Sequence, residues 1–178
     1  DDNEDGYVDY EALVGYIMSF IPSEEAFEAL ALITSQYLDA AKIVVKEIDA
    51  ILEWINDEEL IHNALILINA LVWHEEIVSD LNPYINNFLV LSQNLDSDNL
   101  KVIYSILSCY TQTKQGLTSI EDYEMLGSLF DKAFEDTEIF YNALCFVEKV
   151  NNETRHPSLF MERANALDFF EKSLDSSD

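Results

Sequence analysis

Apolar residues recur at helical spacing along almost the whole chain, and short polar joints separate one amphipathic stretch from the next. The pattern predicts helices at about 8–20, 23–38, 40–55, 57–73, 79–92 and 97–111, a seventh that begins near 119, and two more at 136–150 and 158–174. Ser23 is expected to cap the second helix, and Pro83 is expected in the first turn of the fifth, where proline is tolerated.

Four of these helices share a small residue at their middle with a large apolar residue beside it. The stretch EELIHNALILINAL at 58–71 has a partner in TEIFYNALCFVEKV at 137–150. The small residues of the series are spaced 35, 41 and 38 positions apart and are Ala29, Ala64, Ser105 and Ala143. A separate amphipathic helix precedes each of the four, and a helix pair repeated at this period is typical of an α-solenoid.

We therefore predict an all-α fold, a right-handed α-solenoid of about four stacked helix pairs with a C-terminal capping helix. Residues 1–178 are expected to form a single domain or fragment. It would comprise an acidic leader at 1–6, the helix-pair repeats at 7–150, a loop at 151–157 and the capping helix at 158–174. The alternative is a non-repeating helical bundle, whose helices would show similar amphipathicity.

Composition supports helices and a packed core. Hydrophobic residues make up 49% of the 178 residues, too many for a disordered acidic tail. The chain has Gly 4 and Pro 3, whereas β-hairpins and nucleotide-binding loops need more glycine. No apolar run reaches transmembrane length. The chain does not begin with Met and shows no signal peptide, so we expect a fragment of a cytoplasmic or nuclear protein.

The charge narrows the choice of partner. Lys+Arg 9 against Asp+Glu 35 gives a formal net charge of −26. Such a surface repels nucleic acid and anionic membranes and attracts basic proteins. The cysteines, Cys109 and Cys145, fall within apolar helical patterns and are predicted to be buried thiols in a reducing compartment, with no disulfide between them.

No catalytic motif emerges from the sequence. The run His74-Glu75-Glu76 lacks the second histidine of a zinc-binding helix, and no cysteine pair has ligand spacing. The glycines are isolated, so no phosphate-binding loop is expected. We predict a non-enzymatic chain without a cofactor.

The opening stretch DDNEDGYVDYEALVGYIMS has the spacing of a calcium-binding loop. Asp1, Asn3 and Asp5 stand at alternate positions and Gly6 follows, but the twelfth position, which needs a carboxylate, is Ala12. The stretch resembles the degenerate EF-hand loop of myosin light chains, which binds no calcium. Asp1, Asn3 and Asp5 are thus weak metal candidates, and a calcium-responsive regulatory module is one alternative function.

The helix pairs at 24–150 are similar to HEAT or armadillo repeats, and most similar to importin-β-type nuclear transport receptors. The resemblance implies that the second helix of each pair lines a concave surface. It also implies transport, with a basic cargo or a small regulatory GTPase as the partner.

Aligning the second helices by their small residue places acidic, amide and aromatic side chains in two adjacent columns. The predicted partner-binding residues are Glu24, Glu28, Glu59, Asn63, Tyr104, Glu138 and Asn142. Carboxylates pair with Lys and Arg, and amides can satisfy a peptide backbone, so the set suits a basic, partly extended protein. A chaperone for a basic ribosomal or histone client would need the same surface. A spacer whose charge only keeps it in solution would not bind such a partner.

Overall fold

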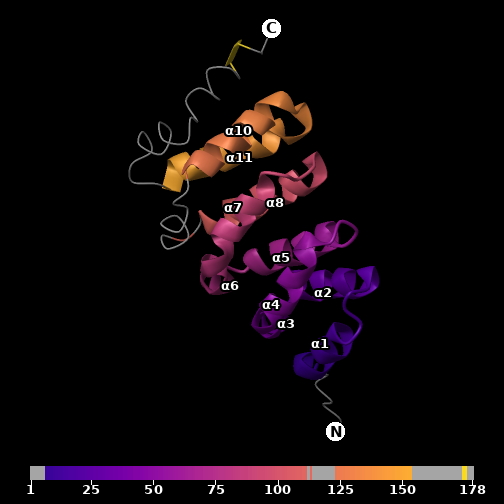
Figure 1. Ribbon diagram of the computed structural model, residues 1–178. Helices are drawn as coiled ribbons and strands as arrows, with labels where there is room; N and C mark the ends of the chain where they lie inside the picture. Colours follow the sequence, from indigo (N-terminus) through magenta and orange to yellow (C-terminus); the bar gives the residue numbers. More distant parts are fainter. Residues whose placement is uncertain (1–6, 112, 114–122, 154–173, 176–178) are drawn as a thin grey trace. The chain divides into compact units, whose positions relative to one another are not determined.

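The computed structural model describes residues 7–111, 113, 123–153 and 174–175 (Figure 1). In this part of the chain the regular structure is helical and no strand occurs, so the predicted all-α class is confirmed. None of the described helices is long and apolar enough to cross a membrane. The chain divides into two compact units, residues 1–77 (unit 1) and residues 78–178 (unit 2), which are described separately.

In its described residues, 7–77, unit 1 contains five complete α-helices and two short 3-10 segments. In chain order they are α1 (Tyr10–Met18), α2 (Glu24–Gln36), α3 (Leu38–Val44), η1 (Val45–Glu47), α4 (Ile48–Leu52), η2 (Glu53–Asn56) and α5 (Ile61–Val72). Helix α6 (Glu75–Leu81) begins in this unit and ends in the next.

Side-chain caps fix where these helices start. Ser23 caps α2 as predicted, because its Oγ accepts the backbone N–H of Ala26 at 3.3 Å. Asp9 caps α1 in the same way, accepting the N–H of Ala12 at 3.1 Å.

The predicted helix at 40–55 is wrong as a continuous element. The chain instead runs through α3, η1, α4 and η2, and Glu47 leaves the helical region at φ −99 and ψ 18. The break follows the β-branched run Ile43-Val44-Val45, whose side chains crowd the preceding helical turn. The apolar stripe survives the break, since Val44, Ile48, Ile51 and Ile55 are all buried.

In unit 1, helices that hold the same position in successive helix pairs pack against each other. The first helix α1 packs on α3, and α2 packs along α5 (Figure 1). The core between α2 and α5 is fully buried at Phe27, Leu30, Leu65 and Ile68. Ala64 is also fully buried, as expected of a small residue that lets a neighbouring helix approach.

Unit 2 repeats this arrangement. Its described elements are η3 (Asn82–Tyr84), α7 (Ile85–Ser92), α8 (Ser97–Tyr110), α10 (Tyr123–Glu135) and α11 (Thr137–Glu153). Helix α7 packs on α10, and α8 packs along α11. Ala143 is fully buried, whereas Ser105 in α8 and Ala29 in α2 are half-buried.

The predicted helix at 79–92 is also wrong as one element. Helix α6 begins earlier, at Glu75, and ends at Leu81, and Pro83 lies in η3 before α7 begins. Proline cannot donate the backbone hydrogen bond that would continue α6, so the chain restarts with a 3-10 turn. By contrast, α8 begins at Ser97 as predicted, and Asp96 caps it by accepting the N–H of Asn99 at 2.9 Å.

Three predicted segments lie outside the described residues. They are the leader at 1–6, the start of the helix near 119 and almost all of the capping helix at 158–174. The loop predicted at 151–157 begins later than expected, because α11 continues to Glu153. The single domain at 1–178 stays a prediction.

Candidate functional site

The negative charge is concentrated in unit 1. Residues 1–77 contain 18 carboxylates and two lysines, Lys42 and Lys46, whereas residues 78–178 contain 17 carboxylates and seven basic residues. Two lysines cannot neutralise 18 carboxylates, so unit 1 keeps a strong negative field at neutral pH.

In unit 1, four predicted partner-binding residues lie on helices that pack together. Glu24 and Glu28 are exposed on α2, one turn apart. Asn63 is half-buried in the first turn of α5, and Glu59 is exposed just before that helix. Since α2 packs along α5, these side chains belong to one two-helix layer.

Glu59 lies in a turn and not on the helix, a correction to the predicted helix at 57–73. The Asp57 carboxylate accepts the backbone N–H groups of Glu59 at 2.9 Å and Leu60 at 3.1 Å. This cap orders the turn before α5 begins at Ile61 and leaves the Glu59 side chain exposed to solvent.

In unit 2, Tyr104 is a clear correction, because it is a core residue and not a surface one. Its side chain is 1% exposed, its hydroxyl donates to the carbonyl of Leu129 at 2.7 Å, and its ring lies 6.0 Å from that of Phe146. Burial raises the pKa of this hydroxyl well above its usual value, so it stays a hydrogen-bond donor. Leu100, one turn earlier on α8, is buried too.

The other two predicted residues of unit 2 lie on α11. Glu138 is exposed and pairs with Lys101 of α8 at 3.8 Å, and Lys101 also reaches Asp98 at 3.8 Å. Asn142 is half-buried one turn later. The predicted column is therefore partly neutralised and partly buried in unit 2, and unit 1 holds the better candidate surface.

Exposed aromatic side chains occur in both units. Trp73 is 69% exposed at the end of α5, and Tyr141 is 72% exposed on α11. Exposed aromatic rings of this kind are the side chains that commonly anchor a protein partner.

His74, Cys109 and Cys145 lie at least partly inside the packed helices. His74 is half-buried, and its Nε2 is hydrogen-bonded to the carbonyl of Thr34. Cys109 is buried, and burial raises the pKa of its thiol to about 11, so it is protonated at neutral pH. Cys145 is half-buried, less protected than predicted.

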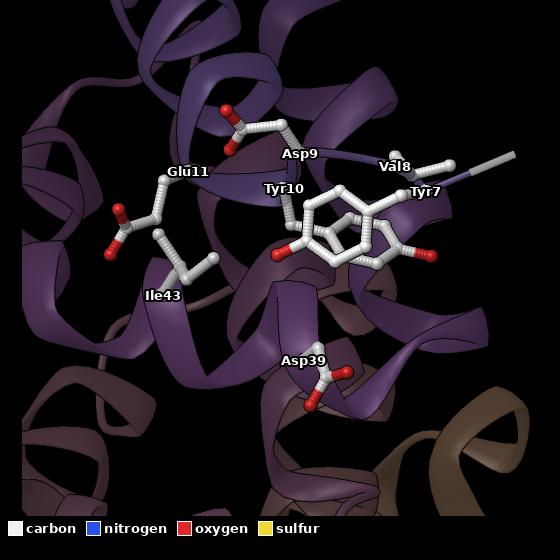
Figure 2. Close-up of a pocket in the computed structure, with 7 residues that line it drawn as sticks. All are labelled: Tyr7, Val8, Asp9, Tyr10, Glu11, Asp39 and Ile43. Carbon is white, nitrogen blue, oxygen red and sulfur yellow. The ribbon is translucent and has the colours of Figure 1, made fainter.

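A further hollow, which the sequence reasoning missed, lies where α1 begins beside α3. It has a volume of about 480 Å³ and is lined by Tyr7, Val8, Asp9, Tyr10, Glu11, Asp39 and Ile43 (Figure 2). The signal in the sequence is weak, because Tyr10 and Asp39 are far apart along the chain and meet only when α1 packs on α3.

The metal candidates Asp1, Asn3 and Asp5 lie outside the described residues. Within the residues that are described, no three His, Cys, Asp or Glu side chains are grouped closely enough to hold a metal ion.

Comparison of the chain with known protein families, with curated proteins and with solved structures gives no match. The resemblance to HEAT-type transport receptors stays a prediction.

Proposed function

We propose that this chain is a non-catalytic interaction module that binds a basic, partly extended protein segment, and that the surface formed by α2 and α5 carries the binding. The observation behind the proposal is the excess of carboxylates over lysines in unit 1, with Glu24, Glu28 and Glu59 exposed on or beside two helices that pack together.

We also propose that the helix pairs form a right-handed α-solenoid. The packing within each unit supports this proposal. In unit 1 α1 packs on α3 and α2 packs along α5, and in unit 2 α7 packs on α10 and α8 packs along α11. In each unit the first helix of one pair thus packs on the first helix of the next pair, and the second helix on the second. A non-repeating bundle has no reason to repeat that pairing, so the repeated pattern favours stacked pairs.

The expected energetics are those of many weak contacts. One exposed ion pair contributes about 0.2–1 kcal/mol, so three carboxylates together supply roughly 0.6–3 kcal/mol. The wider negative field of unit 1 mainly accelerates association and makes it sensitive to salt. Exposed aromatic residues such as Trp73 would add anchors that salt does not screen.

The proposal is tested with matched charge variants and a basic peptide of about 20 residues. The test variant replaces Glu24, Glu28 and Glu59 with Gln. The control variant makes the same change at three exposed glutamates on other elements of unit 1, Glu47, Glu53 and Glu75. Both variants lose three negative charges, so a general charge effect weakens binding equally in both.

We expect the test variant to bind about tenfold more weakly than the parent and the control about two- to threefold more weakly, by fluorescence anisotropy at about 50 mM salt. Equal losses would mean that net charge, and not this surface, attracts the peptide. A transport receptor and a chaperone would share the surface, and proteins captured from a lysate would separate the two by the client that they carry.

A further inference from the structure

We propose that the hollow between the start of α1 and α3 is a binding site for one guanidinium group, carried by an arginine side chain of a protein partner. The site lies apart from the α2 and α5 carboxylates. The inference rests on the proposed function for its source of arginine, but the hollow itself can be tested alone.

The lining of the hollow combines aromatic rings with negative charge. Tyr7 and Tyr10 contribute the rings, and Asp9, Glu11 and Asp39 contribute carboxylates. The ring of Tyr37 lies 5.5 Å from that of Tyr10 and extends the aromatic surface at its edge. A cation is attracted both to the face of a tyrosine ring and to a nearby carboxylate, so both kinds of side chain favour the same class of ligand.

Nothing on the lining neutralises this charge. The seven described residues that form it include no lysine, arginine or histidine. Asp9 already accepts the N–H of Ala12 as the cap of α1, whereas Glu11 and Asp39 have no ion-pair partner within the described chain. The Glu11 and Asp39 carboxylates are therefore available to bind a cationic ligand.

The arrangement favours a guanidinium over an ammonium. In Figure 2 Glu11 of α1 lies beside Ile43 of α3, and Asp39 of α3 lies below the two tyrosine rings; both carboxylates are exposed. A guanidinium has five N–H donors in a plane, so it can lay its face on a ring while its edge donates to an exposed carboxylate that turns toward it. A lysine ammonium is a compact, strongly hydrated point charge without a planar face to lay on a ring, so it gains less from the tyrosines.

The electrostatics of Tyr10 agree with this geometry. Burial raises the pKa of Tyr10, and the neighbouring Tyr37 and the Asp39 carboxylate raise it further. The Asp39 carboxylate is thus close enough to act on the Tyr10 side chain, which agrees with a cation held near both groups.

The test uses the full chain labelled with ¹⁵N and three short peptides, acetyl-Gly-X-Gly-amide with arginine, lysine or citrulline as X. Citrulline has nearly the shape of arginine without its charge. We expect the arginine peptide to shift the amide signals of residues 7–11 and 39–43 saturably. The lysine peptide should bind at least threefold more weakly, and the citrulline peptide should leave these signals unchanged.

Two variants test the lining, and two serve as controls. Tyr10→Leu and Asp39→Asn should each weaken arginine binding about two- to fivefold. Tyr16→Leu and Glu58→Gln make the same chemical changes on exposed side chains outside the hollow, and should leave it unchanged. Circular dichroism checks that Tyr10→Leu still folds, and Asp39→Asn remains informative if it does not.

The proposal is overturned if arginine and lysine peptides bind equally, if the shifts are spread over unit 1, or if both variants bind like the parent. The outcome also separates this site from the proposed function. Binding of the long basic peptide without effect of Tyr10→Leu or Asp39→Asn would remove the hollow alone. Binding of the arginine tripeptide without binding of the long peptide would remove the proposed function and keep the hollow.

Discussion

The replacement of Tyr104 by phenylalanine tests whether this residue belongs to the core of unit 2 or to a binding surface. Its side chain is 1% exposed, and its hydroxyl donates to the carbonyl of Leu129 at 2.7 Å. Tyr104→Phe removes the hydroxyl and keeps the ring that packs near Phe146. Any loss of stability therefore reports on the buried hydrogen bond.

The magnitude follows from the contact that is removed. A buried hydrogen bond between neutral groups contributes about 0.5–1.5 kcal/mol, so we expect the free energy of unfolding to fall by about 1 kcal/mol. With a urea m-value of about 1–3 kcal/mol/M, the midpoint of the transition that includes unit 2 should fall by roughly 0.3–1 M.

The assay is urea unfolding followed by far-ultraviolet circular dichroism. Tyr141→Phe is the matched control, because Tyr141 is 72% exposed in the same unit and should change the stability by less than about 0.5 kcal/mol. Binding of the basic peptide by folded Tyr104→Phe should be unchanged. An unchanged midpoint together with weaker peptide binding would refute the assignment of Tyr104 to the core.

Three further predictions concern unit 2: two hydrogen-bonded links between its helices and the burial of its two cysteines. Asp136 caps α11 and accepts from the serine that begins α8, and this serine hydrogen bond, followed by the backbone bond, lowers the pKa of the Asp136 carboxyl below its ordinary value. The contribution of the ionised Asp136 carboxylate to folding stability is fully present above the ordinary aspartate pKa and is lost as pH falls through the lower pKa of the folded chain. The difference in unfolding midpoint between the parent and Asp136→Ala should therefore shrink on acidification below about pH 4. Lys132 of α10 donates to the carbonyls of Ser92, which ends α7, and of Gln93, which follows it, and Lys132→Met should lower the free energy of unfolding by about 1–2 kcal/mol in urea titration; an unchanged midpoint would contradict that link. In the native chain at pH 8, Cys145 should react with a thiol reagent well before Cys109, whose burial raises its pKa to about 11, and the opposite order would contradict this burial.

Local signals in the sequence predicted most helix starts well. The predicted starts at 23 and 97 are real helix starts, and Ser23 and Asp96 cap them, because a cap satisfies backbone donors that the helix itself leaves unpaired. The helical spacing of apolar residues at 40–55 is also kept in the structure, since Val44, Ile48 and Ile51 are buried although the helix breaks. These features depend on residues within a few turns of one another.

Features that depend on tertiary packing were harder to predict. The break after Val45 relieves crowding at β-branched residues while keeping the stripe buried, and periodicity alone does not distinguish a broken helix from a continuous one. Tyr104 was predicted to bind a partner, but its hydroxyl donates to the carbonyl of Leu129 on α10 and its ring is buried in the core. The hollow beside Tyr10 requires knowing that α1 packs on α3.

The most direct test of the central claim is the salt dependence of binding between the full chain and the 20-residue basic peptide, with the Glu24, Glu28 and Glu59 triple glutamine variant measured alongside. The account predicts tight binding at about 50 mM salt, loss of most of the affinity at about 0.5 M, and a shallower salt dependence for the triple variant. Binding that is indifferent to salt, or a triple variant that follows the parent at every salt concentration, would contradict it.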